Sequence, residues 1–330
     1  MAEVRKIELL SPAKDLLTGI EAIKHGADAV YIGAPKYSAR TAVGCSVDDI
    51  KELCTYAHLF DAKVYVALNT ILYEEELKEV EQLIWELYDA GADALIVQDM
   101  GITGLDLPPI PLHASTQAEN STPEKVAFLE QVGFTQVVLA RELTLNQIQH
   151  ISSQTTVPLE AFVHGALCVS YSGNCYLSEA VSGRSANRGS CAQYCRLPYT
   201  LIDHKGEVIV RNKHLLSLKD LNQSDYLLDL LEAGVSSLKI EGRLKDVSYV
   251  KNITAFYRKK LDQLFTQHKQ YIRASSGFST YTFTPQPNKS FNRGFTSFFL
   301  HGRGEEIGSF DSPKSLGEPV GRVKEHRGPS

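Results

Sequence analysis

Four cysteines in the middle of the chain are the residues best suited by type and spacing to do chemistry. Cys168, Cys175, Cys191 and Cys195 follow the pattern C-x6-C-x15-C-x3-C. The chain has six cysteines among 330 residues, too few for a disulfide framework in a protein of this size. Clustered cysteines outside such a framework indicate metal binding or redox chemistry. We therefore predict that these four form one metal-binding site.

The spacing of the cysteines favours an iron-sulfur cluster over zinc. Structural zinc sites usually separate the cysteines of both ligand pairs by about two to four residues, and here only the second pair does so. Irregular thiolate spacing is common at 4Fe-4S clusters, which a glycine-containing loop can wrap. Zinc and free thiols remain alternatives. The other two cysteines, Cys45 and Cys54, are expected to be small buried hydrophobic residues.

A basic segment accompanies the cysteines. Between Arg184 and Lys219 there are seven Lys or Arg against two Asp or Glu, although the whole chain has a formal net charge of −5. The acidic total disfavours a protein that coats nucleic acid, whereas a local basic segment is suited to phosphate groups. Tyrosines beside the cysteines could stack on a base. A solvated loop and packing over the metal site are the alternative interpretations. The substrate-binding candidates are Arg141, Arg184, Arg188, Arg196, Tyr171 and Tyr194.

Polar residues at the ends of apolar segments supply the catalytic candidates. Glu241 and Arg243 follow the last predicted strand, where parallel barrels often bind phosphate. Glu160 is expected inside the barrel, paired with Arg141 or Arg243, because a buried carboxylate needs a partner. Structural hydrogen bonding is the alternative role, and His164 could instead orient a cysteine ligand. The catalytic candidates are His113, His164, Glu160, Glu241 and Arg243. The candidates at strand ends, Asn69, His113, Gln117, Arg141, His164, Glu241 and Arg243, are expected to line one pocket.

The elements that must position these residues repeat one pattern: a helix that ends in glycine, followed by an apolar strand. It occurs at residues 21–33, 86–98, 128–140 and 230–242. Such glycines suit the left-handed position that ends a helix, and the apolar runs are typical of parallel strands buried on both faces. Eight strands are predicted, near Ile7–Leu10, Ala29–Ile32, Val64–Leu68, Ala94–Val97, Pro111–Ala114, Gln136–Leu139, Leu159–Val163 and Ser237–Ile240. Helices are predicted at Glu74–Asp89, Pro123–Gln131, Leu143–Ser152 and Asp246–Phe265. The fold class indicated is α/β, a (β/α)8 TIM-type barrel.

The pattern also divides the chain. Residues 1–270 are predicted to form the barrel, with an enlarged cysteine-rich insertion at 164–219 after strand seven that contains a hairpin. Residues 271–330 change to a Ser, Phe, Thr, Asn and Gly composition and are expected to be a C-terminal extension, part of an incomplete second domain. The N-terminus has no secretory apolar region and no segment reaches the length of a membrane span, so a cytoplasmic protein without membrane partners is expected.

The segment from Glu160 to Ser178, EAFVHGALCVSYSGNCYLS, resembles the characteristic block of peptidase family U32. The blocks ELLSPAKD, GADAVYIGAPKYSAR, LHASTQ and SLKIEGRLK resemble other parts of that family, and the similarity covers roughly residues 5–265. The resemblance implies two competing activities. Some members are described as collagenase-like proteases of unknown catalytic type. Others take part in oxygen-independent hydroxylation of quinone precursors or RNA bases, with a 4Fe-4S cluster held by four cysteines.

For the RNA-acting members, the resemblance implies 5-hydroxylation of a tRNA wobble uridine or of a cytidine in large-subunit rRNA, with prephenate as a possible co-substrate. A peptidase needs an activated nucleophile or a metal-bound water. The sequence contains neither G-x-S-x-G nor H-E-x-x-H. We therefore expect an enzyme that hydroxylates RNA, with tRNA or rRNA as partner. A peptidase acting on proteins is the alternative, and a noncatalytic scaffold with structural zinc is the third.

Overall fold

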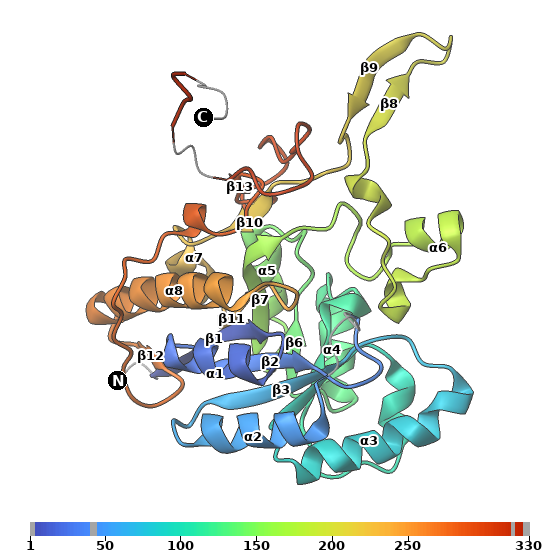
Figure 1. Cartoon of the computed structure of the whole chain (residues 1–330). Coiled ribbons are helices and arrows are strands. Elements are labelled where there is room, and N and C mark those ends of the chain that lie inside the picture. The colour runs from blue at the N-terminus through green and yellow to red at the C-terminus, as the bar shows by residue number, and fades with distance from the viewer. Residues whose placement is uncertain (1–3, 40–44, 318–320, 326–330) are drawn as a thin grey trace, which may run out of the picture.

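The computed structural model describes residues 4–39, 45–317 and 321–325, and its centre is a closed barrel (Figure 1). Within these residues, eight parallel strands form the ring, each paired with the next, and the last strand pairs with both the seventh and the first. The predicted (β/α)8 barrel is therefore confirmed. The strands are β1 (Arg5–Ala13), β2 (Ala29–Gly33), β3 (Lys63–Leu68), β4 (Ala94–Val97), β5 (Leu112–Ala114), β6 (Gln136–Val138), β7 (Leu159–Ala166) and β11 (Val235–Ile240).

Helices surround the barrel and pack on its outer face through the main hydrophobic core (Figure 1). Several begin where a Ser, Thr or Asp side chain accepts a backbone N–H of the first turn, as Asp15, Ser46 and Asp246 do. These caps satisfy donors that have no partner within the helix. The helix predicted from Glu74 starts with a 3-10 turn at Glu74–Glu76. The helices are α1 (Leu16–Lys24), α2 (Val47–His58), α3 (Leu77–Asp89), α4 (Pro123–Gln131), α5 (Leu145–Ser152), α7 (Leu227–Glu232) and α8 (Val247–Gln267).

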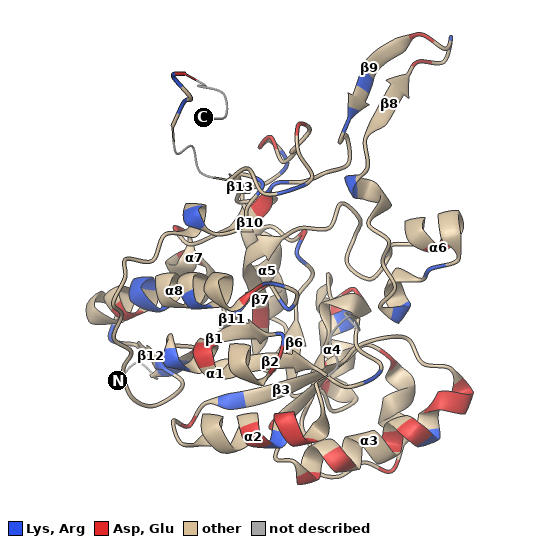
Figure 2. Ribbon diagram, in the orientation of Figure 1, with Lys and Arg blue, Asp and Glu red and all other residues tan. Residues whose placement is uncertain are grey.

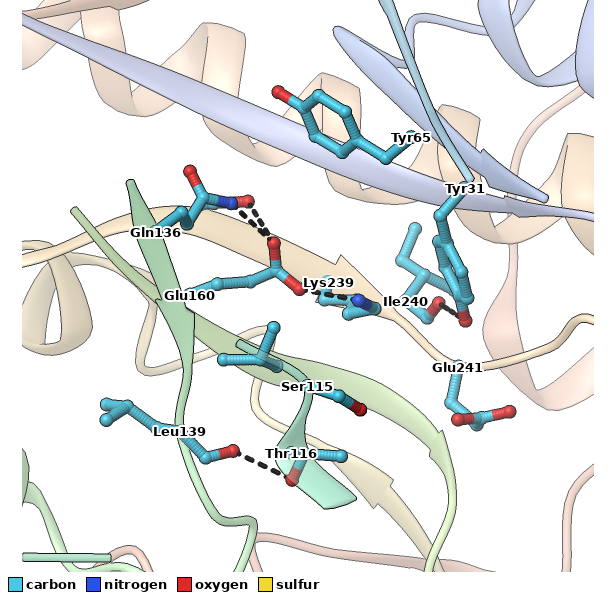
Figure 3. A network of polar contacts seen from close by, with 12 residues as sticks. Tyr31, Tyr65, Ser115, Thr116, Gln136, Leu139, Glu160, Lys239, Ile240 and Glu241 are labelled. Atoms are coloured by element: carbon cyan, nitrogen blue, oxygen red, sulfur yellow. Dashed lines mark hydrogen bonds and ion pairs between the residues drawn. The ribbon is translucent and has the colours of Figure 1, made fainter. Parts of the chain in front are cut away.

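Polar side chains occupy much of the barrel interior, together with a small apolar cluster. Glu160 of β7 is fully buried; it accepts hydrogen bonds from Lys239 Nζ at 2.6 Å and Gln136 Nε2 at 2.7 Å (Figure 3). Ser237 donates to Glu8 and to Glu160, and burial raises the pKa of Glu8 to about 7. The buried partner predicted for Glu160 was an arginine, and the structure corrects this to Lys239. The neighbouring strand β11 places Lys239 beside Phe162, two residues further along the barrel wall, from where its Nζ reaches Glu160.

A bulge in the pairing of β7 with β11 decides where His164 points. Lys239 pairs with Phe162, whereas the next residue, Ile240, pairs with His164. The skipped residue breaks the alternation of side chains, as β-bulges do. His164 therefore packs against α8, where its Nδ1 lies 3.2 Å from the hydroxyl of Tyr257. The sequence had suggested that His164 follows strand seven. The structure instead places His164 within β7.

The segment between β7 and β11 is the largest insertion. It contains α6 (Leu177–Ser182), the hairpin of β8 (Tyr199–Ile202) and β9 (Val208–Lys213), and β10 (Asp220–Asn222). The hairpin projects away from the barrel, whereas β10 returns to pair antiparallel with β7 (Figure 1).

Residues after α8 pack on the barrel in the described part of the chain. Strand β12 (Tyr271–Arg273) pairs with β1, and β13 (Phe295–Thr296) pairs with β10. Tyr271 and Leu300 are buried in the main core. The division into a barrel and a C-terminal extension stays a prediction.

Charge is unevenly distributed over the molecule. Acidic side chains gather along α2 and α3, and basic ones recur in the segment from α6 to β10 (Figure 2). Helices in the described residues are all too short or too polar to cross a membrane.

The Lys239–Glu160 pair predicts a stability effect. Lys239→Met leaves the carboxylate of Glu160 buried without its cation, so the free energy of unfolding should fall by about 3 kcal/mol. Lys63→Met is the matched control, because Lys63 is exposed and lies 4.0 Å from Asp93, and it should cost under about 1 kcal/mol. Urea unfolding measures both values. Equal stabilities for the two variants would contradict this account of the barrel interior.

Candidate functional site

All four predicted metal ligands line one cavity of about 170 Å³. Its walls also include Thr116, which follows β5, and Arg141, which follows β6. The cavity therefore lies over the C-terminal ends of the barrel strands, the end at which barrel enzymes carry their sites. We call it the cysteine cavity. Cys168 is exposed, and Cys175, Cys191 and Cys195 are half-buried.

A second, smaller cavity of about 50 Å³ lies at the mouth of the barrel itself. We call it the mouth cavity. Its lining shares three residues with the cysteine cavity, namely Thr116, Gln117 and Arg141. The two cavities are therefore neighbours across a common wall. The other lining residues of the mouth cavity are Tyr31, Ala39, Ala67, Asn69, Ile96, Ser115, Phe162, Lys239, Glu241 and Arg243.

Arg141 forms the charged part of the common wall. Its Nη2 donates to Glu241 at 2.7 Å and its Nη1 donates to the carbonyl of Ala166 at 3.0 Å. The guanidinium also lies over the Phe162 ring, 3.9 Å from its centroid. A side chain held by an ion pair, a backbone carbonyl and a ring is preorganised for a bound anion.

The far side of the mouth cavity is built from the β2 and β3 connections. Arg243 is buried and donates to the hydroxyl of Ser38 at 2.5 Å. Asn69 accepts the backbone N–H of Ala39 and donates to Ser115. Four of the residues predicted to share a pocket with Arg141, namely Asn69, Gln117, Glu241 and Arg243, do meet it here.

The two candidate histidines do not line either cavity. His113 lies inside the barrel edge-on to Tyr65, with ring centroids 4.7 Å apart. His164 lies on the other side of the barrel wall, against α8. Burial lowers the pKa of each to about 3, so both imidazoles are neutral at physiological pH. The expected single pocket with both histidines is therefore not formed, and a catalytic role for them stays a prediction. Glu160 also lies below the mouth cavity, in the interior network.

Charged contacts anchor the cysteine-bearing loop to the barrel at three points. The first is Glu142, whose carboxylate accepts the backbone N–H and the hydroxyl of Ser172, both at 2.9 Å. Ser172 lies between Cys168 and Cys175. At the next residue, Gly173, φ is +77° and a Cβ would come within 2.1 Å of the carbonyl oxygen of Gln117, so only glycine fits there.

The second anchor joins the stretch before Cys191 to the connection after β3. Arg188 donates to both carboxylate oxygens of Glu76, at 2.6 and 2.7 Å. It also donates to the carbonyl of Ile71, and its guanidinium lies over the Tyr73 ring. Its hydrogen bond to Arg188 holds the pKa of Glu76 below its usual range. Arg188 makes this anchoring contact, and the substrate binding expected of it stays a prediction.

The third anchor is Arg196, next to Cys195. It donates to the carbonyl of Leu167 at 2.7 Å, the hydroxyl of Ser217 at 2.8 Å and the carbonyl of Leu218 at 3.0 Å. The contact with Leu167 ties the segment of Cys195 to that of Cys168. Burial raises the pKa of the Cys195 thiol, and the positive charge of Arg196 opposes this rise.

The remaining substrate-binding candidates lie at the surface of the insertion. Tyr171 is 57% exposed at the rim of the cysteine cavity, with its hydroxyl accepting from Arg303. Arg184 is exposed and donates to the carbonyl of Ser190. Tyr194 is half-buried, and its carbonyl accepts the hydroxyl of Tyr199. Substrate binding by these residues stays a prediction.

The cysteines surround a space and do not converge on one point. In the described part of the chain, no three His, Cys, Asp or Glu side chains are placed to hold one metal ion. Four thiolates on one zinc would each lie about 2.3 Å from it and hence close together. A 4Fe-4S cluster binds each cysteine at a different iron, so its thiolates lie farther apart around a central volume. The four cysteines line one cavity, and which of these centres they would hold is part of the proposed function.

Sequence reasoning missed the residues that support the site. Lys239 had a visible signal, because a lysine within a strand predicted to be buried needs a buried partner. Glu142 and Glu76 had no such signal in the sequence, since each meets its partner only after barrel closure brings distant connections together.

Comparison with known proteins identifies the family of this chain. The family model described as "Peptidase family U32" matches residues 14–309. The chain belongs to peptidase family U32. That match confirms the family that the cysteine block had indicated.

Curated relatives within and around this family carry different activities. The chain is 56% identical over 318 residues to the 23S rRNA 5-hydroxycytidine C2501 synthase of Escherichia coli K12, covering 96% of this chain and 49% of that protein. It is 33% identical to the tRNA hydroxylation protein P of the same organism, covering 78% and 68%. It is 32% identical to a collagenase of Porphyromonas gingivalis, covering 78% and 66%. The chain thus spans about half the length of the rRNA-modifying relative.

The Glu76–Arg188 anchor predicts a local opening of the loop. Glu76→Gln weakens the ion pair, so amide hydrogen exchange at residues 186–190 should become roughly threefold faster. Lowering the pH should open the loop in the same way as this substitution. Because Arg188 lowers the pKa of Glu76, the contact is fully present above the ordinary value of 4.5 and is lost as pH falls through the lowered value. Glu75→Gln, at an exposed neighbour, is the control. Unchanged exchange in the Glu76 variant would count against the anchor.

Proposed function

We propose that this chain carries out 5-hydroxylation of a pyrimidine base in rRNA or tRNA, with a 4Fe-4S cluster held by Cys168, Cys175, Cys191 and Cys195. One observation carries the proposal: the four cysteine side chains line a single cavity that shares a wall with the barrel mouth. The relatives named for rRNA and tRNA hydroxylation support the substrate class. Because the chain spans half of the rRNA-modifying relative, the activity of the whole protein is part of the proposal.

The donor set favours the cluster over zinc. Four thiols surround a volume without converging on one point, and the glycine at 173 allows the loop to pass close to Gln117. All-cysteine sites select zinc or iron-sulfur clusters among the metals. Of these two, the open arrangement fits the cluster better. Zinc as an alternative occupant would give a structural site without redox chemistry.

Each group of residues has a distinct part in the proposed reaction. When bound, the cluster supplies one-electron redox chemistry that side chains cannot. Arg141 and Arg243, which both line the mouth cavity, are suited to hold anionic groups. A carboxylate of prephenate, the possible co-substrate, has the matching charge. Tyr171 presents an exposed ring at the rim on which a base can stack. The anchored loop keeps the cysteines in a fixed position relative to the mouth cavity. An RNA substrate of this kind would be met in the cytoplasm.

Peptide hydrolysis has less support from the site. The described lining of both cavities contains no histidine, so the serines and cysteines there have no imidazole to activate them. Because one relative is named a collagenase, peptide hydrolysis is tested as the alternative activity.

The activity is tested by nucleoside mass spectrometry. In a strain lacking its own copy of the gene, the 5-hydroxypyrimidine in 23S rRNA or tRNA should be absent and should return when the full chain is expressed. Cys168→Ala should reduce it by more than about tenfold, because loss of a ligand typically removes the metal and its chemistry. Unaltered rRNA and tRNA nucleosides in the deletion strain would refute the function. Collagen cleavage that persists in the Cys168 variant would favour the peptidase.

The cofactor is tested separately by anaerobic purification. The wild-type protein should be brown and contain roughly four iron and four sulfide per chain. Cys191→Ser should lose most of this iron. Cys54→Ala is the matched control, because Cys54 is buried among apolar residues of the main core, and it should keep the wild-type content. Colourless protein containing zinc after anaerobic preparation would refute the cluster.

A further inference from the structure

Arg196 places a positive charge in the wall of the cysteine cavity. Its three hydrogen bonds all go to neutral acceptors, the carbonyls of Leu167 and Leu218 and the hydroxyl of Ser217. Arg196 is half-buried in this wall, so its charge is only partly solvated. A charge in this position needs compensation.

The other arginines that line the cysteine cavity each have a carboxylate. Arg141 pairs with Glu241 at 2.7 Å, and Arg293 pairs with Asp220 at 2.8 Å. For Arg196, no carboxylate lies within 4.0 Å in the described part of the chain. Asp220 is close enough to affect its pKa, but the carboxylate of Asp220 is bound by Arg293. Glu142, the carboxylate in the cavity wall, accepts from Ser172.

The groups able to compensate this charge are the cysteines. Cys195 precedes Arg196 in the chain, and Cys168 and Cys195 line the same cavity as Arg196. Free thiols are neutral at physiological pH, whereas metal ligation requires thiolates. A half-buried cation loses part of its hydration, and an anionic centre beside it compensates that loss. The wall of the cavity is therefore complementary in charge to a thiolate-ligated centre.

We propose that Arg196 is the counter-charge and positioning residue of the cysteine-held centre. Its hydrogen bond to Leu167 fixes the segment of Cys168 against that of Cys195, and its positive charge offsets part of the net negative charge of a centre ligated by four thiolates. This inference rests on the iron-sulfur cluster proposed above. This role is an alternative to the substrate binding expected of Arg196, which stays a prediction.

The two parts of this role have separate consequences. Loss of the hydrogen bonds should loosen the ligand segments and speed the loss of the cluster. Loss of the charge should lower the reduction potential, because a nearby cation favours the form of the cluster that carries one more electron. A lysine at this position keeps the charge but cannot bridge three acceptors in the same geometry.

The test compares three variants of the full chain, purified and reconstituted without air. Arg196→Met removes both charge and hydrogen bonds, Arg196→Lys keeps the charge, and Arg211→Met removes an exposed arginine from β9 of the same insertion as a matched control. Iron and sulfide content, the midpoint potential and the rate of cluster bleaching by a chelator are measured, with circular dichroism to verify folding.

We expect Arg196→Met to bleach about tenfold faster than wild type and to have a lower midpoint potential. Arg196→Lys should bleach faster but keep a potential near that of wild type, and Arg211→Met should match wild type in both. Wild-type potential and bleaching in Arg196→Met would overturn the inference and leave the cluster in place. A wild-type protein that binds no iron would overturn the proposed cofactor instead. If Arg196→Met does not fold, Arg196→Lys is compared with the uncharged variant Arg196→Gln. Midpoint potentials that are equally lowered in these two variants would overturn the counter-charge.

Discussion

The pairing of β7 with β11 is the constraint on which the rest of the structure depends. These strands are separated in sequence by the whole cysteine-rich insertion, yet they lie side by side and close the barrel. Strand β10 pairs antiparallel with the end of β7, so the chain that follows the cysteines returns to the rim at which β7 ends. The loop that leaves β7 must therefore turn back over the barrel mouth, and its cysteines are gathered above the strand ends.

Closure also creates the polar interior. Glu160 enters from β7 and Lys239 from β11, and each compensates the buried charge of the other. The bulge between these strands turns His164 outward and leaves Phe162 beneath Arg141. The mouth cavity is therefore lined by Phe162 of β7 and not by His164.

The cysteine loop is held by polar contacts more than by a hydrophobic core of its own. Glu142, the Glu76–Arg188 pair and Arg196 each tie a different cysteine segment to the barrel. Hydrogen bonds and ion pairs fix direction as well as distance, which apolar packing does less well. A metal centre whose ligands are spread over a long loop needs this kind of support. The same contacts leave an opening at the rim, where Tyr171 is exposed.

The sequence by itself determined the strands, the helices and the location of the insertion, because periodic apolar runs and helix-ending glycines are local signals. It also determined the four cysteines as one group, since their spacing is local too. Only the tertiary structure decided the partner of Glu160, the direction of His164 and the anchoring role of Arg188, because each depends on strand register or on contacts between residues far apart in the chain. Charge compensation at Arg196 belongs to the same class: which acceptors surround a guanidinium is fixed only when the barrel has closed.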